Sequence, residues 1–266
     1  MGMTSTPVLM YHSVGRPSDK RFRPWVVSPS LLAEHVAALA ESGYELVGTT
    51  EWARQKEERK YAVLTFDDGY ADFVENALPI LTAARARATA YVVTAYIGDK
   101  ARWLPFHREQ LRPLMSWEDL RAIRDSGVEV GSHGNRHLEL DAVPPRVAEE
   151  DILRSLAALQ ENGFSPQSFC YPFGYASRGT RDIVARAGFS TSCIVGRGLA
   201  ERRRDLLRIR RLAIDFRTSP EALLRQISGP TVPPAALLRS AAQPAWRVTR
   251  RVRSLRRQAV GAGVAE

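Results

Sequence analysis

The chain has 266 residues, a hydrophobic content of 44% and a formal net charge of +9, which suit one globular catalytic domain with a short appendage. No segment approaches the roughly 18 uninterrupted apolar residues of a membrane-spanning helix, and the apolar run 7–10 is too short for a secretion signal. These features argue against an integral membrane protein and predict a cytoplasmic one. Cys170 and Cys193 lie in apolar, strand-like segments, so we expect reduced core thiols.

The positive charge is unevenly distributed. Residues 201–266 contain 15 arginines and five carboxylates, a net charge of +10, so residues 1–200 must sum to about −1. The Pro-rich stretch 229–234 separates a catalytic domain, predicted for residues 1–228, from a linker and basic tail at 229–266. We expect this tail to be helical or disordered. Peripheral contact with an anionic membrane, at the inner face, is one hypothesis for it, and nucleic acid is a less favoured partner.

Apolar runs bounded by turn residues alternate with segments of helical period, which is typical of an α/β fold built on parallel strands. Ser28 followed by Pro29 predicts a helix start, and Gly43 predicts its end. A second helix is predicted from Ser116, which pairs with Asp119 in a capping-box pattern. The predicted strands, in chain order, are 7–11, 44–47, 62–66, 89–93, 128–131, 168–171, 189–195 and 207–212.

Two adjacent carboxylates, Asp67 and Asp68, follow the apolar strand 62–66 and precede Gly69. Neighbouring side chains on a strand point in different directions, so one aspartate can bind a metal while the other faces a substrate. The alternative is a turn in which one aspartate only caps the next helix, because Asp-Asp-Gly is a common turn composition.

A second polar segment, Ser132-His-Gly-Asn-Arg-His137, follows the strand at 128–131. Two histidines four residues apart can point at one ion, and imidazole is the commonest ligand of zinc-like metals. With one of the aspartates they would supply three protein ligands and leave a position open for water, as catalytic sites require. The histidine pair alone also occurs without a metal.

A third segment, Tyr171-Pro-Phe-Gly174, turns the chain at the end of the strand 168–171. Alone it would be an ordinary strand end with a turn. All three segments, however, lie at the carboxyl ends of predicted strands, where barrels and open α/β sheets assemble their sites. The sequence therefore predicts one functional site built from the three segments.

In order and spacing, Thr65-Phe-Asp-Asp-Gly69, the histidine pair and Tyr171–Gly174 resemble the motifs of the polysaccharide deacetylase family, the fourth family of carbohydrate esterases. The likeness covers roughly residues 7–215. It implies a distorted (β/α)7 barrel in which Asp68, His133 and His137 hold one divalent metal ion. Zn²⁺ suits this mixed ligand set, and Co²⁺, Ni²⁺ or Mn²⁺ would suit the same ligands.

The resemblance also implies further roles at the site. Asp67 would be the general base. The third segment would bind the substrate through its four residues, Tyr171, Pro172, Phe173 and Gly174. The backbone N–H of Phe173 would donate a hydrogen bond to the oxyanion. The opening segment 7–15 resembles the first strand of the branch that acts on poly-N-acetylglucosamine and similar exopolysaccharides. In that branch an N-terminal histidine takes the general-acid role, and because no histidine follows His137, His12 is the candidate here.

The chain departs from the family pattern at three places, one of which is the absence of a histidine after the late segment Leu207-Arg208-Ile209-Arg210. Many members have Ser or Thr directly after the first ligand histidine, whereas Gly134 follows here. Many also carry an arginine in the third motif that orients the base, and Cys170 stands in its place. Either a different group must therefore position Asp67, or the pKa of Asp67 is tuned differently.

The resemblance implies a metal-dependent hydrolase that removes acetyl groups from an N-acetylglucosamine-type glycan or a lipid-linked glycan precursor. A water activated by the metal and Asp67 would attack the acetamide carbonyl, and His12 would protonate the departing amine. Two alternatives remain: an O-acetyl esterase on the same fold, and a catalytically silent carbohydrate-binding or scaffold protein. In the long loop 98–115, Trp103, Pro105 and Phe106 either form a sugar-stacking lip or only anchor the loop.

Overall fold

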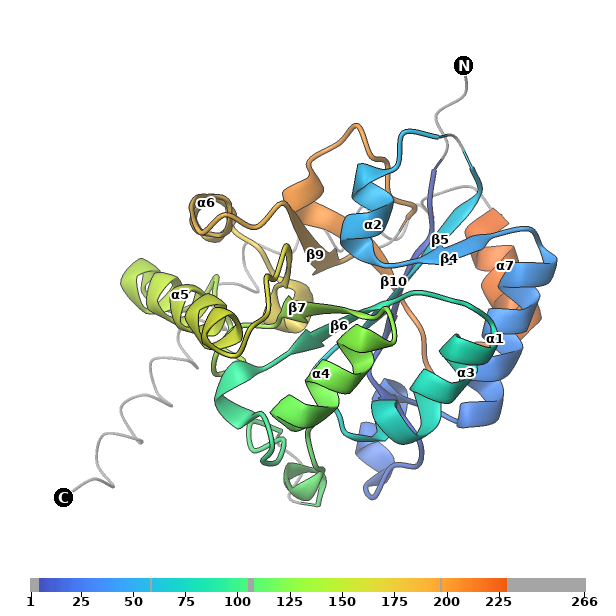
Figure 1. Ribbon diagram of the computed structural model, residues 1–266, viewed down its shortest axis with the longest axis horizontal. Coiled ribbons are helices and arrows are strands. Elements are labelled where there is room, and N and C mark those ends of the chain that lie inside the picture. The colour runs from blue at the N-terminus through green and yellow to red at the C-terminus, as the bar shows by residue number, and fades with distance from the viewer. Residues whose placement is uncertain (1–4, 58, 105–107, 197, 229–266) are drawn as a thin grey trace.

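Each strand predicted from an apolar run is present, and together they build the predicted parallel barrel. The computed structural model describes residues 5–57, 59–104, 108–196 and 198–228. The predicted tail at 229–266, together with Pro105 and Phe106, lies outside the described residues. Figure 1 shows the helices arranged around the strands.

The elements alternate along the chain as the sequence predicts. The strands are β1 Val8–Tyr11, β2 Ser13–Val14, β3 Val26–Val27, β4 Glu45–Val47, β5 Tyr61–Phe66, β6 Thr89–Val92, β7 Glu129–Ser132, β8 Ser168–Cys170, β9 Thr191–Val195 and β10 Ile209–Ala213. The α-helices are α1 Pro29–Glu41, α2 Thr49–Arg54, α3 Leu78–Ala83, α4 Trp117–Asp125, α5 Pro145–Glu161, α6 Arg178–Arg186 and α7 Pro220–Ser228. The shorter helical segments are η1 Lys20–Trp25, η2 Phe73–Ala77, η3 Thr94–Tyr96, η4 Glu109–Leu111, η5 Pro172–Gly174 and η6 Leu206–Arg208.

A single extra pairing closes the sheet into a barrel. The strands run in the order β1-β10-β9-β8-β7-β6-β5, and β1 also pairs with β5, so these strands form a ring. β4 pairs with the first half of β5 and β6 with its last two residues, which distorts the ring at this point. All pairings in the ring are parallel, so the carboxyl ends of the strands share one rim.

The side chains of the strands alternate between two apolar layers. Inward-facing residues such as Val8, Val63 and Cys170 form one buried cluster. Outward-facing residues such as Leu9 and Leu64 pack in another cluster with side chains of α1, α4 and α7. Figure 1 shows α1, α3 and α7 on one side of the barrel and α5 and α6 on the other. Both faces of the strands are thus covered, which explains their nearly continuous apolar sequences.

The predicted helix signals are confirmed. Ser28 caps α1 by accepting a hydrogen bond from the Leu31 amide at 3.1 Å. The α1 exit uses Gly43 at φ +78°, where a side chain would be strained. Ser116 and Asp119 form the capping box of α4. Among the residues described, no helix has the length and apolar character needed to cross a membrane.

Candidate metal and catalytic site

Asp68, His133 and His137 converge at the carboxyl rim of the barrel. Asp68 follows β5, and both histidines lie in the segment after β7. Asp68 Oδ1 is 3.4 Å from His133 Nε2 and 3.2 Å from His137 Nε2, and all three side chains are buried. Within the described part of the chain, Asp68 Oδ1 has no hydrogen-bond partner. A buried, unpartnered oxygen facing two imidazole nitrogens is an arrangement that could hold a metal ion.

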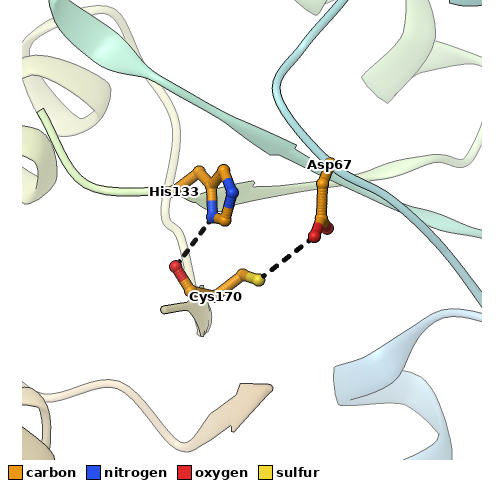
Figure 2. Close-up of side chains that lie close together, drawn as sticks. All are labelled: Asp67, His133 and Cys170. Carbon is orange, nitrogen blue, oxygen red and sulfur yellow. Dashed lines mark hydrogen bonds between the residues drawn. The ribbon is translucent and has the colours of Figure 1, made fainter. Parts of the chain in front are cut away.

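The atoms of Asp68 and His133 that do not face the candidate metal position are held by hydrogen bonds. Tyr70 Oη donates to Asp68 Oδ2 at 2.8 Å. His133 Nδ1 lies 2.8 Å from the carbonyl oxygen of Cys170, so Nδ1 carries the proton and Nε2 remains free as a ligand (Figure 2). The residues present therefore fit one divalent cation with mixed nitrogen and oxygen ligands.

Asp67 is held by a buried arginine that the motifs did not identify. Arg211, on β10, donates from Nη1 to Asp67 Oδ1 at 2.6 Å and from Nη2 to Asp67 Oδ2 at 2.7 Å. Arg211 is 0% and Asp67 3% exposed. Burial raises the pKa of Asp67, but Arg211 and His133 outweigh it, so the pKa lies below its usual range. Asp67 therefore stays ionised, as a general base requires.

Asp67, His133 and Cys170 also lie close enough together to be considered as a second ligand set. Both oxygens of Asp67 already accept hydrogen bonds from the guanidinium of Arg211, and a cation at this position would face that positive charge. Burial also raises the pKa of the Cys170 thiol well above its usual value, so the sulfur keeps its proton. Of the two groups, Asp68, His133 and His137 are therefore the better fit for a cation.

Cys170, at the place where the sequence resemblance leads one to expect an arginine, lies beside Asp67. Its Sγ lies 3.6 Å from Asp67 Oδ2, and Arg211 Nη2 lies 3.0 Å from that Sγ (Figure 2 shows the Cys170–Asp67 contact). The small side chain leaves room for a guanidinium that arrives from β10 instead of β8. Cys170 and Cys193, which are register partners on β8 and β9, are both free buried thiols, as predicted.

Asp151 anchors the loop that carries the two histidines. This fully buried residue of α5 accepts hydrogen bonds from the backbone N–H groups of Asn135 at 2.8 Å and Arg136 at 3.1 Å. Gly134 has φ +75°, and a Cβ there would lie 2.8 Å from Asp151 Oδ2. Glycine is thus required where many family members have Ser or Thr, because the Asp151 carboxylate fixes the loop.

His12 lies beside the two carboxylates. It directly follows β1, and the Asp67 amide donates to the carbonyl oxygen of Tyr11 at 2.9 Å, which brings the two strand ends together. Burial lowers the pKa of His12 below its usual value, and the charges of Asp68 and Asp67 offset this only in part. The structure therefore places His12 within the electrostatic field of the proposed base and metal ligand.

The turn after β8 and the loop after β6 flank His137 with aromatic rings. Phe173 is 46% exposed and meets the His137 ring edge-on, with centroids 4.7 Å apart. Trp103 stacks on His137 with centroids 4.9 Å apart and also contacts Tyr96. Trp103 therefore both anchors its loop and forms a wall of the site. The Tyr171 side chain is instead buried with residues of α5 and α6, and its hydroxyl donates to the Leu207 carbonyl oxygen at 3.4 Å.

Backbone strain is concentrated at this site. Of the described residues, the non-glycine ones with positive φ are Asp68, Arg85, His137 and Phe173. Three of the four belong to the site. Such conformations cost about 1–3 kcal/mol each and persist where the surroundings enforce them, which is common at functional sites.

Comparison with known proteins finds similar sequences and similar folds. The family model described as polysaccharide deacetylase matches residues 54–192. YxkH of Bacillus subtilis (strain 168), which is named for this family, is 25% identical over 215 residues, covering 78% of this chain and 71% of YxkH. The poly-beta-1,6-N-acetyl-D-glucosamine N-deacetylase of Escherichia coli (strain K12) is 30% identical over 145 residues, which are 50% of this chain and 21% of that protein.

Two solved structures share the fold. The deacetylase PplD of Streptococcus pyogenes, in complex with acetate, superposes with a TM-score of 0.73 at 24% identity, covering 86% of this chain and 100% of that chain. IcaB from Ammonifex degensii superposes with a TM-score of 0.71 at 24% identity, covering 84% of this chain and 96% of that chain.

Proposed function

Because the chain belongs to the polysaccharide deacetylase family of enzymes, we propose that it hydrolyses the acetamide of an N-acetylglucosamine-type sugar, in a glycan or a lipid-linked glycan precursor. The observation that carries this proposal is the pair of adjacent carboxylates with different partners. Asp68 turns an unpartnered oxygen toward two histidines, whereas Asp67 is held by Arg211. This arrangement separates ligand from base within one motif.

The proposed chemistry follows from these two tasks. A divalent ion held by Asp68, His133 and His137, with Zn²⁺ preferred and Co²⁺, Ni²⁺ or Mn²⁺ as alternatives, would polarise the acetyl carbonyl and acidify a water. Asp67 takes a proton from that water as it attacks the carbonyl carbon. The exposed turn at Phe173 and the adjoining Pro172 and Gly174 border the acetyl group, and the Phe173 N–H stabilises the oxyanion.

Acetate release from two substrates tests this function. We expect metal-restored protein to release acetate from N-acetylglucosamine oligomers and metal-stripped protein to release none. An O-acetylated sugar serves as the comparison substrate. Release from the ester alone would replace the proposal by an O-acetyl esterase, and bound metal without release from either substrate would favour a carbohydrate-binding protein.

His12 is proposed as the general acid that protonates the departing amine. Replacing it with asparagine should slow amide hydrolysis by about 10²–10⁴-fold, the usual contribution of such a group. The rate of ester hydrolysis should fall much less, because a sugar alkoxide leaves more readily than an amine nitrogen that has not first received a proton. The measurement is kcat for both substrates at saturating metal. An equal loss on both would assign His12 to another task.

A further inference from the structure

Tyr70 divides the two oxygens of Asp68 between two partners. It follows Asp68 and Gly69 directly, is 1% exposed, and donates from Oη to Asp68 Oδ2 at 2.8 Å. The other oxygen, Oδ1, is the one that faces His133 and His137. One oxygen is therefore engaged by a neutral hydroxyl, and one remains for a cation.

The backbone at Asp68 adopts an unfavourable conformation. Asp68 has φ +76° and Gly69 φ +78°, so two successive residues adopt the left-handed region. A non-glycine residue keeps this conformation only when its surroundings hold it there. The hydrogen bond from Tyr70 holds Asp68 at Oδ2, the oxygen other than the one near the two histidines.

Tyr70 is itself held on two sides. Its backbone forms a bridge with Leu114, and the neighbouring Ala71 amide donates to the Pro113 carbonyl oxygen at 3.0 Å. Its ring meets Phe22 edge-on, with centroids 5.9 Å apart, and the guanidinium of Arg112 lies 5.8 Å from the ring centroid.

Arg112 is fixed in turn by two carboxylates. It pairs with the fully buried Glu109 at 2.8 Å and with Asp72 at 3.1 Å. The ring of Tyr70 therefore packs against an ionic network that does not include any of the proposed metal ligands. This rigidity is what a residue that aims a metal ligand requires.

We propose that Tyr70 is a positioning residue that restricts Asp68 to binding the metal through one oxygen, and that it thereby sets metal affinity and coordination number. The inference rests on the proposed metal centre. Without the hydroxyl, Oδ2 would be buried and unpartnered, and the carboxylate would be free to rotate or to offer both oxygens to the ion.

The test uses the full chain with Tyr70→Phe, stripped of metal and titrated with Co²⁺ and Zn²⁺ against a competing chelator. We expect affinity to fall by about 10–100-fold, the usual effect of losing an outer-shell partner. The visible absorption of bound Co²⁺ should change and weaken, because absorption weakens as coordination number rises. A purely structural role would leave that spectrum unaltered.

Tyr91→Phe is the matched control. Tyr91 is also fully buried, and its hydroxyl hydrogen-bonds Thr49 and Ser168 at 3.0 and 2.6 Å, away from Asp68. We expect both variants to lose similar thermal stability without metal, and only Tyr70→Phe to lose affinity. Wild-type affinity and spectrum in Tyr70→Phe, or an equal loss in Tyr91→Phe, would overturn the role of Tyr70 alone. Absence of Co²⁺ binding by the wild type would overturn the metal centre as well.

Discussion

Replacing Arg211 with methionine should lower the rate of amide hydrolysis by at least about 10²-fold and destabilise the fold by about 3–5 kcal/mol, since it leaves a buried carboxylate unpaired. Arg211 makes two hydrogen bonds to Asp67 and a third, from Nη1, to Thr65 Oγ1 at 3.0 Å. Methionine retains much of the volume but none of the donors. Acetate release and chemical denaturation, measured on the same preparation, test both effects.

An exchange variant separates positioning from general stability. In Cys170→Arg combined with Arg211→Cys, the guanidinium would reach Asp67 from β8, the strand from which many family members supply it. Arg211 Nη2 contacts Cys170 Sγ at 3.0 Å, so the two side chains are direct neighbours beside Asp67. We expect the exchange variant to be at least tenfold more active than Arg211→Met. Full wild-type activity in a folded Arg211→Met protein would show that Asp67 needs no such partner.

Arg211→Lys provides a pH readout of the same interaction. Lysine keeps the charge but loses the two-pronged contact that holds the pKa of Asp67 low. The acid limb of the activity profile should therefore move to higher pH. For stability, a lowered folded-state pKa means that the contribution of Asp67 is fully present above the unfolded pKa and is lost as pH falls through the folded value. The stability difference between wild type and Arg211→Lys should accordingly narrow in acid.

Asp67→Asn should remove about 10²–10⁴-fold of the amide hydrolysis rate while leaving metal affinity nearly unchanged, because an amide cannot accept the proton of water. Asp68→Asn is the matched control, since it changes the adjacent carboxylate in the same way. We expect the control to lose metal binding together with activity. Bound metal and acetate release should be measured for each variant after equilibration with the same free metal concentration.

The outcome for this pair distinguishes base from ligand. Loss of metal in Asp67→Asn with retention in Asp68→Asn would reverse the two assignments. Loss in both would indicate that the ion is shared by both carboxylates, contrary to the observation that Arg211 engages both oxygens of Asp67.

The strands and their terminal motifs could be predicted because local sequence dictates them. Apolar runs covered on both faces give continuous hydrophobic segments, and polar residues at their carboxyl ends must meet at one rim in a parallel sheet. For this reason the sequence predicts that Asp67, Asp68, His133 and His137 meet at one rim, and the structure brings their side chains together. Closure of the barrel through β1 and β5 depends on long-range pairing that no local pattern encodes.

The missed residues share a physical cause. Arg210 and Arg211 are neighbours on β10, and only the register of that strand decides that Arg211 faces inward with Ile209 while Arg210 is exposed. Asp151 lies on a helix that packs behind the histidine loop, so sequence spacing gives no hint of it. The same uncertainty in side-chain direction explains why Tyr171, grouped with the substrate residues, has its ring between the sheet and α5 and α6.

The central claim is that one metal ion held by Asp68, His133 and His137 makes this chain a deacetylase. Its most direct test is acetate release from N-acetylglucosamine oligomers as a function of metal bound per chain, starting from stripped protein. We predict a linear rise that ends at one equivalent, with no such rise in Asp68→Asn. Release that is independent of bound metal, or that needs more than one equivalent, would contradict the claim.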